Sequence, residues 1–213
     1  MKTIFNILLI LHIVGGSIGL ISGTINIIRK KGDKSHKLIG KFFLYGMLIA
    51  GFCSLILAVM HPNYFLFIVG VFTIYMVSTG ERYLYLKKLL QDQKPILLDW
   101  ILAGFMLLFG FAFIAFGIKL FMQSEKFGIV FIVFGFVSLR FVYTDWQNYT
   151  GKAKIKNYWL LAHLQRMTGA YIASLTAFLV VNKFLPGIIV WLLPTVILTP
   201  LIFIWSKKYA VKK

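Results

Sequence analysis

Long apolar runs alternate with short polar gaps along the chain, and this pattern predicts most of the structure. The runs cover residues 4–28, 38–60, 64–86, 97–121, 127–145, 158–182 and 186–206. An apolar run of about 20 residues is long enough to cross the hydrocarbon core of a bilayer. Because hydrocarbon does not tolerate unpaired backbone polar groups, each run is expected to be a helix. The sequence therefore predicts an all-α bundle of seven transmembrane helices, with residues 1–213 forming a single integral membrane domain.

Composition supports the membrane prediction and argues against a soluble protein. Hydrophobic residues make up 60% of the 213 residues and charged residues only 14%, which leaves too few polar side chains to cover a soluble domain. The formal net charge of +17 would suggest nucleic acid as the partner of a soluble protein. Here the basic residues lie mostly between the apolar runs, where they anchor and orient helices. The expected partner is therefore the lipid bilayer and not nucleic acid.

The distribution of Lys and Arg predicts how the chain crosses the membrane. Stretches rich in Lys and Arg alternate with stretches that hold at most two, and the rich ones are 29–41, 82–94, 140–156 and the tail 207–213, which together hold 18 basic residues against 4 on the other side. Loops rich in Lys and Arg stay on the cytoplasmic side. We therefore expect a multi-pass membrane protein with the N-terminus outside and the C-terminus inside. The first three and last three helices then have matching orientation, which suggests a parallel 3+1+3 repeat.

Small residues form a packing seam along the first apolar run. Gly15, Gly19 and Gly23 recur every four residues, a spacing that lets two transmembrane helices approach closely. His12 and Asn26 follow the same seam, so we expect both side chains to face protein rather than lipid. The seam is predicted to pack against a neighbouring helix, in this chain, in a second copy or in another membrane protein.

The sixth apolar run is unusual because His163 and Arg166 lie well inside it. A central arginine costs about 2.5–3.5 kcal/mol on insertion scales, so a neighbouring group must offset its charge. We expect Arg166 to pair with Glu81 or Asp145. These residues would line a polar pocket open to the cytoplasm, and the full predicted set is His36, Glu81, Arg140, Asp145, His163 and Arg166.

A purely structural interpretation of the same residues stays open. Glu81, Arg82, Asp99 and Asp145 lie near the ends of apolar runs, where acidic and basic side chains commonly cap helices or reach the membrane interface. In this interpretation, His163 and Arg166 only cross-link helices.

The four histidines allow an alternative in which the protein carries haem. The pairs His36/His163 and His12/His61 loosely match transmembrane cytochromes b, in which two imidazoles at one depth hold each haem, although one member of each pair lies at a loop. The sequence has no closely spaced metal-binding motif, no nucleophile elbow, no phosphate-binding loop and no dinucleotide fingerprint. It therefore predicts no cofactor, with haem b as the alternative, and it gives no positive sign of an enzyme.

Three parts of the chain resemble one protein family: residues 11–43, residues 61–84, and residues 163–182 with their continuation at 191–205. The motifs that carry the resemblance are His12 with the following glycines, Gly32 with His36 and Gly40, and His163 with Arg166. Together they resemble the bacterial membrane proteins grouped as the DUF2306 family, especially forms of the Bacteroidetes type. The resemblance implies a multi-pass protein of the bacterial inner membrane. That family has no established activity to carry over, so the resemblance supports the topology and singles out His12, His36, His163 and Arg166.

Three functions follow from these patterns. In the first, the pocket binds or transports a small solute or protons, with His163 as proton carrier, Arg166 as anion clamp, and Glu81 or Asp145 as counter-charge. In the second, the protein is a b-type haem protein that passes electrons across the membrane. In the third, it is a non-catalytic accessory subunit that docks on another membrane protein through the glycine seam of the first helix.

Overall fold

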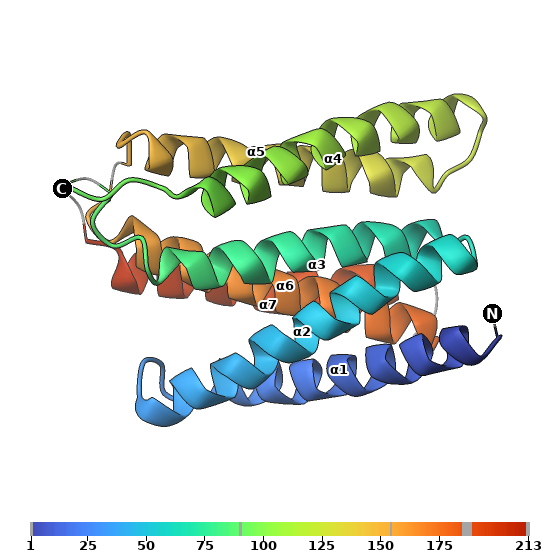
Figure 1. Cartoon of the computed structure of the whole chain (residues 1–213), viewed down its shortest axis with the longest axis horizontal. Helices are drawn as coiled ribbons and strands as arrows, with labels where there is room; N and C mark the ends of the chain where they lie inside the picture. The colour runs from blue at the N-terminus through green and yellow to red at the C-terminus, as the bar shows by residue number, and fades with distance from the viewer. Residues whose placement is uncertain (1, 90, 154, 185–188, 212–213) are drawn as a thin grey trace. The chain divides into compact units, whose positions relative to one another are not determined.

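The computed structural model describes residues 2–89, 91–153, 155–184 and 189–211. The helices in these residues are α1 (Lys2–Ile28), α2 (Lys34–Met60), α3 (Tyr64–Tyr83), α4 (Leu97–Met122), α5 (Gly128–Tyr149), α6 (Tyr158–Val181) and α7 (Ile189–Tyr209). Figure 1 shows these seven helices along the chain. All seven are long and apolar enough to cross a membrane. The predicted all-α class with seven membrane-spanning helices is confirmed. Residues 186–188 of the last predicted run lie outside the described residues.

Several helix ends differ from the ends of the apolar runs, for local reasons. Helix α2 begins at Lys34, before the apolar run, because the Asp33 carboxylate caps it by accepting the His36 N–H at 2.6 Å. Helix α3 ends at Tyr83, and the turn after it is tied down by the Tyr158 hydroxyl. That hydroxyl donates to Leu86 O and accepts the Leu89 N–H.

The chain divides into two compact units. Unit 1 comprises Met1–Glu81 and Leu161–Tyr209, and therefore holds α1, α2, α7 and most of α3 and α6. Unit 2 comprises Arg82–Leu160 and Ala210–Lys213, and holds α4 and α5 with the segments that lead into and out of them.

In unit 1, the glycine seam of α1 faces α2 of the same chain. A Cβ built on Gly15 would lie 2.9 Å from Gly46 O, and one built on Gly46 would lie 2.7 Å from Gly15 O. The two backbones are thus too close for side chains at these positions. His12 joins the same pair of helices, since its Nδ1 lies 2.9 Å from Ala50 O.

In unit 2, α4 and α5 form a hairpin with an equally close approach. A Cβ on Gly117 would lie 2.7 Å from Gly128 O. Phenylalanine rings fill the adjoining space, with the Phe131 ring centroid 5.7 Å from that of Phe113 and 5.1 Å from that of Phe116. Both pairs meet edge to face, a favoured aromatic geometry.

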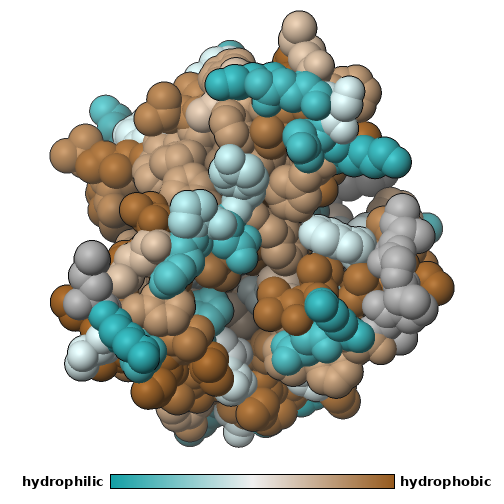
Figure 2. Space-filling view, turned by 90° about the vertical axis from the view of Figure 1, so that its right-hand side faces the viewer, coloured by the Kyte–Doolittle hydropathy of each residue, from teal (hydrophilic) through white to brown (hydrophobic). Residues whose placement is uncertain are grey.

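The surface of the protein is unusually apolar. Large aliphatic side chains stay exposed along the helices, for example Ile10 at 60% and Leu108 at 68%. On the face shown in Figure 2, hydrophobic residues cover most of the area and hydrophilic residues form separate patches. A soluble protein rarely exposes apolar surface on this scale. With seven membrane-length helices, this surface identifies a multi-pass membrane protein whose apolar faces contact lipid.

Candidate functional site

Helices α3 and α6 of unit 1 approach each other closely at two glycines. A Cβ on Gly169 would lie 2.5 Å from Met76 Cε, and a Cβ on Gly80 would lie 3.1 Å from the Cβ of Arg166. The absence of side chains at Gly80 and Gly169 therefore lets the helices meet. This contact places the polar residues of α6 directly against the last turns of α3.

His163 is fixed by a backbone carbonyl of α3. Its Nδ1 lies 2.8 Å from Gly80 O. A carbonyl oxygen only accepts hydrogen bonds, so Nδ1 must carry a hydrogen. The neutral ring then has its lone pair on Nε2, which is the atom that can take up a proton or bind a ligand. Glu81, the next residue of α3 after Gly80, adds a negative charge that acts on His163.

Arg166 points into the protein and is only 1% exposed. Its Nη1 donates to Thr79 Oγ1 at 2.9 Å, while the Thr79 hydroxyl donates its own hydrogen to Tyr75 O at 2.7 Å. The guanidinium carbon also lies 4.9 Å from the centre of the Tyr75 ring, in the range of a cation–π interaction. The charge that is costly in lipid is thus held against two polar groups of α3.

Other residues of the predicted pocket have partners of their own. Asp145, in unit 2, is fully buried and accepts a hydrogen bond from the Tyr83 hydroxyl at 2.6 Å. Arg140 is exposed and donates to Thr144 Oγ1, one turn along the same helix, at 2.7 Å. The pairing of Arg166 with Glu81 or Asp145 stays a prediction.

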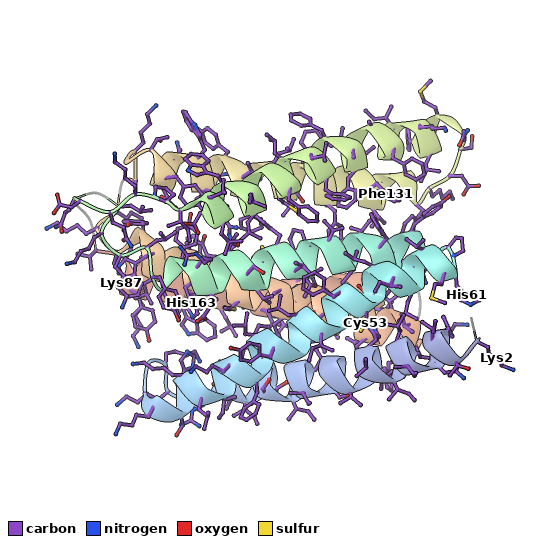
Figure 3. All side chains as sticks on the ribbon, in the orientation of Figure 1. Lys2, Cys53, His61, Lys87, Phe131 and His163 are labelled. Carbon is purple, nitrogen blue, oxygen red and sulfur yellow. The ribbon has the colours of Figure 1, made fainter. Side chains whose placement is uncertain are left out.

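His36 belongs to the same unit as His163 and interacts with it electrostatically. Its carbonyl accepts a hydrogen bond from Asn26 Nδ2 at 3.1 Å. His61, in contrast, packs edge to face on Phe5, with ring centroids 4.5 Å apart. Figure 3 shows His61 and His163 toward opposite ends of the helices of unit 1.

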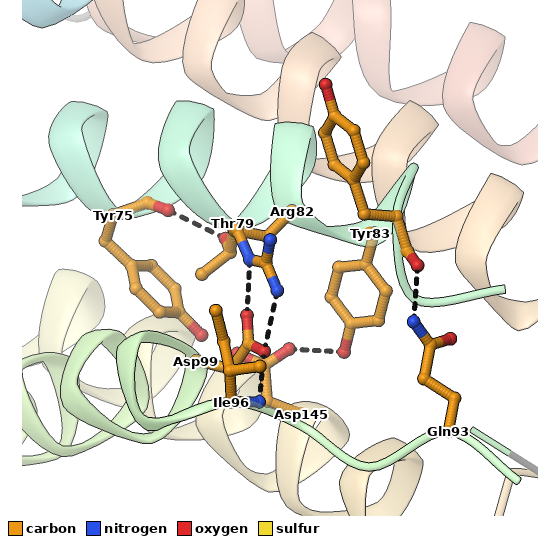
Figure 4. A network of polar contacts seen from close by, with 9 residues as sticks. Tyr75, Thr79, Arg82, Tyr83, Gln93, Ile96, Asp99 and Asp145 are labelled. Carbon is orange, nitrogen blue, oxygen red and sulfur yellow. Dashed lines mark hydrogen bonds and ion pairs between the residues drawn. The ribbon is translucent and has the colours of Figure 1, made fainter. Parts of the chain in front are cut away.

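A buried ion pair in unit 2 was not anticipated from the sequence. Arg82 donates from Nε to Asp99 Oδ1 at 2.7 Å and from Nη2 to Asp99 Oδ2 at 3.0 Å, while the Ile96 N–H donates to Oδ2 at 2.9 Å (Figure 4). Such a two-pronged pair is stronger and more directional than a single contact. The sequence shows only that Arg82 and Asp99 stand at the facing ends of consecutive apolar runs. The same positions are expected for side chains that contact the membrane interface and have no partner in the protein.

A second buried cluster in unit 2 surrounds Tyr83. Its hydroxyl donates to Asp145 and accepts from Asn148 Nδ2 at 3.0 Å, and all three residues are buried. Asp145 and Asn148 stand one turn apart on α5, so they share a helix face. That spacing is visible in the sequence, but nothing there reveals Tyr83 as their common partner.

The described residues contain no group of three or more His, Cys, Asp and Glu that could hold a metal ion. Compared with models of protein families, with curated proteins and with solved structures, the chain shows no match. The resemblance to the DUF2306 family stays a prediction from sequence motifs.

Proposed function

We propose that this chain is a bacterial inner-membrane protein that binds or transports a small solute or protons at a site formed by Glu81, His163 and Arg166. The observation that carries the proposal is the buried guanidinium of Arg166 beside a histidine that is anchored through Nδ1 alone. An ionised side chain this deep in an apolar helix is expensive, and such residues mark solute or proton pathways in membrane proteins.

The three residues have complementary roles in this proposal. Arg166 supplies a fixed positive charge that attracts an anion or tunes the proton affinity of its neighbour. His163 takes up and releases the proton at Nε2, while the Gly80 carbonyl keeps the ring oriented. Glu81 supplies the counter-charge, which is supported by its electrostatic interaction with His163.

The orientation of the site is part of the proposal. The alternation of basic and nearly neutral gaps supports an N-terminus outside and a C-terminus in the cytoplasm, with the site opening to the cytoplasm. Membership in the DUF2306 family is part of the same proposal and is supported by the resemblance of the motifs around His12, His36 and His163 to that family. The 3+1+3 repeat rests on the same matching orientation of the outer helices.

The proposal can be tested by proton flux into sealed proteoliposomes that contain the purified protein, with a pH-sensitive dye trapped inside and an imposed membrane potential. We expect His163→Gln to abolish the flux, because the amide can still donate to Gly80 O but cannot carry a proton. His61→Gln is the matched control, since it removes a histidine far from the site. Flux that is equal in both variants, or equal to that of empty vesicles in the native protein, would reject proton transport.

The accessory-subunit alternative is not favoured by the packing. The glycine face of α1 on which it depends is buried against α2 of the same chain at Gly15 and Gly19. A partner could reach this face only by displacing α2.

A further inference from the structure

Three buried polar atoms at the junction of α1 and α2 have no hydrogen-bond partner: Asn26 Oδ1, Arg29 Nε and His36 Nδ1. Native proteins leave few buried polar atoms unpaired, because an unpaired atom keeps the full cost of losing water. Three such atoms within one helical junction indicate a place where a polar ligand completes the structure.

The remaining polar atoms of the same residues hold the junction together. Asn26 Nδ2 donates to His36 O at 3.1 Å, and the His36 N–H donates to Asp33 Oδ1 at 2.6 Å. Arg29 Nη2 pairs with Asp33 Oδ2 at 3.0 Å. The three unpaired atoms therefore belong to one connected group and not to three separate defects.

The chemistry of the unpaired atoms selects the ligand. Arg29 Nε is a donor, His36 Nδ1 donates in its protonated tautomer, and Asn26 Oδ1 is an acceptor. Basic residues surround the junction, with Lys30, Lys31, Lys34 and Lys37 nearby in the sequence and Asp33 as the single acid among residues 26–41. A ligand with anionic oxygens and an adjacent hydroxyl satisfies all three atoms.

We propose that this junction binds the phosphate group of a phosphate ester that carries a neighbouring hydroxyl. The phosphate oxygens accept from Arg29 Nε and His36 Nδ1, and the hydroxyl donates to Asn26 Oδ1. The ester is either the headgroup of a glycerol-type anionic phospholipid or a soluble polyol phosphate. Ile28, next to Arg29, is 80% exposed at the end of the apolar helix α1, and an exposed apolar side chain beside the site favours a ligand with acyl chains, the lipid.

Lys31 offsets the main obstacle to binding a phosphate at this junction, which is the negative end of helix α1. The C-terminal carbonyls of α1 would repel a phosphate, but Lys31 Nζ donates to Ile27 O at 2.6 Å and to Arg29 O at 2.9 Å. The same ammonium lies 4.4 Å from the centre of the Trp205 ring, which holds it in place. The Arg29 side chain is 30% exposed, so rotating it opens Nε to a ligand.

The test is native mass spectrometry of the full chain in detergent, titrated separately with phosphatidylglycerol, phosphatidylcholine, glycerol 3-phosphate and inorganic phosphate. We expect phosphatidylglycerol to bind at least tenfold more tightly than phosphatidylcholine. Arg29→Gln should weaken phosphatidylglycerol binding about tenfold, as expected for one charge-assisted hydrogen bond. Lys37→Gln, an exposed control with the same change of charge, should weaken it less than about twofold.

A second variant covers the possibility that Arg29→Gln disturbs folding. His36→Leu removes only the side-chain donor, because residue 36 bonds to Asn26 and Asp33 through its backbone; it should also weaken binding. Binding of glycerol 3-phosphate without phosphatidylglycerol would support the phosphate site and assign it to a soluble ligand. Equal losses in Arg29→Gln and Lys37→Gln would overturn the proposal in favour of diffuse attraction. Binding of phosphatidylglycerol and glycerol 3-phosphate no tighter than that of phosphatidylcholine would overturn it in favour of a bound water.

Discussion

The substitution Asp99→Ala tests how the segments of unit 2 are held together. The Asp99 side chain is fully buried, and its two oxygens accept three hydrogen bonds, two from Arg82 and one from the backbone of Ile96. Alanine removes both acceptor oxygens, so the Arg82 guanidinium and the Ile96 N–H lose these hydrogen bonds. We therefore expect a large loss of folding free energy.

The size of the loss follows from the burial of the two partners. Removing one partner of a buried ion pair costs about 3–5 kcal/mol. The Arg82 side chain is 22% exposed, so water restores part of the lost solvation after the substitution. We expect the lower end of the range, about 3 kcal/mol.

The measurement is reversible unfolding in mixed detergent micelles, followed by circular dichroism. Asp99→Asn keeps one neutral acceptor oxygen and should lose less than Asp99→Ala. Asp92→Ala removes an exposed acid from the same connecting segment and should change stability by less than about 0.5 kcal/mol. The reasoning would be refuted if Asp99→Ala destabilised the protein no more than Asp92→Ala does.

Three further predictions concern other parts of the chain. Gly15→Ala should destabilise the protein by about 1–3 kcal/mol, because the new Cβ meets the backbone oxygen of Gly46. Gly16→Ala is the control and should leave stability unchanged, because its Cβ makes only an ordinary contact. Equal losses of stability in thermal unfolding would disprove the close contact at Gly15. The His36 N–H, and then Arg29, hold the pKa of Asp33 below its ordinary value, so its stabilising contribution is present at neutral pH and is lost as the pH falls through that lowered pKa. Unfolding measured against pH should show this loss in the native protein and not in Asp33→Asn. A visible spectrum of the purified protein should lack the sharp Soret band of a bis-histidine haem, and such a band would instead establish the haem alternative.

The helices could be predicted from the sequence because length and apolarity are local properties of the chain. Each of the seven runs is long enough to span a bilayer, and a lipid environment leaves helix as the available conformation for such a run. The ends were less predictable. Lys34 begins α2 because of the Asp33 cap. Helix α3 ends at Tyr83, and the turn that follows bonds to the Tyr158 hydroxyl through Leu86 O and the Leu89 N–H.

The candidate site was predictable only in part. The depth of His163 and Arg166 in an apolar run identified them, since charge in hydrocarbon requires a partner. Their partners in the structure include Gly80 O, the Thr79 hydroxyl and the Tyr75 ring. A backbone carbonyl has no sequence signature, and Thr and Tyr are common in helices, so these contacts depend on how α3 and α6 pack.

The ion pair between Arg82 and Asp99 was missed for a related reason. Both residues stand at the ends of apolar runs, where contact with interfacial water is the ordinary expectation. Their burial depends on the path of the segment between α3 and α4. That path is set by long-range contacts such as the Tyr158 hydroxyl with Leu86 and Leu89, which periodicity does not reveal.

The most direct test of the proposed site is nitrogen-15 NMR of the His163 ring, in protein reconstituted into lipid bilayers and assigned with His163→Gln. The account predicts a neutral ring with its hydrogen on Nδ1, bonded to Gly80 O, and reversible proton uptake at Nε2 as the pH is lowered. A ring with its hydrogen on Nε2, or one that never takes up a proton while the protein stays folded, would contradict it.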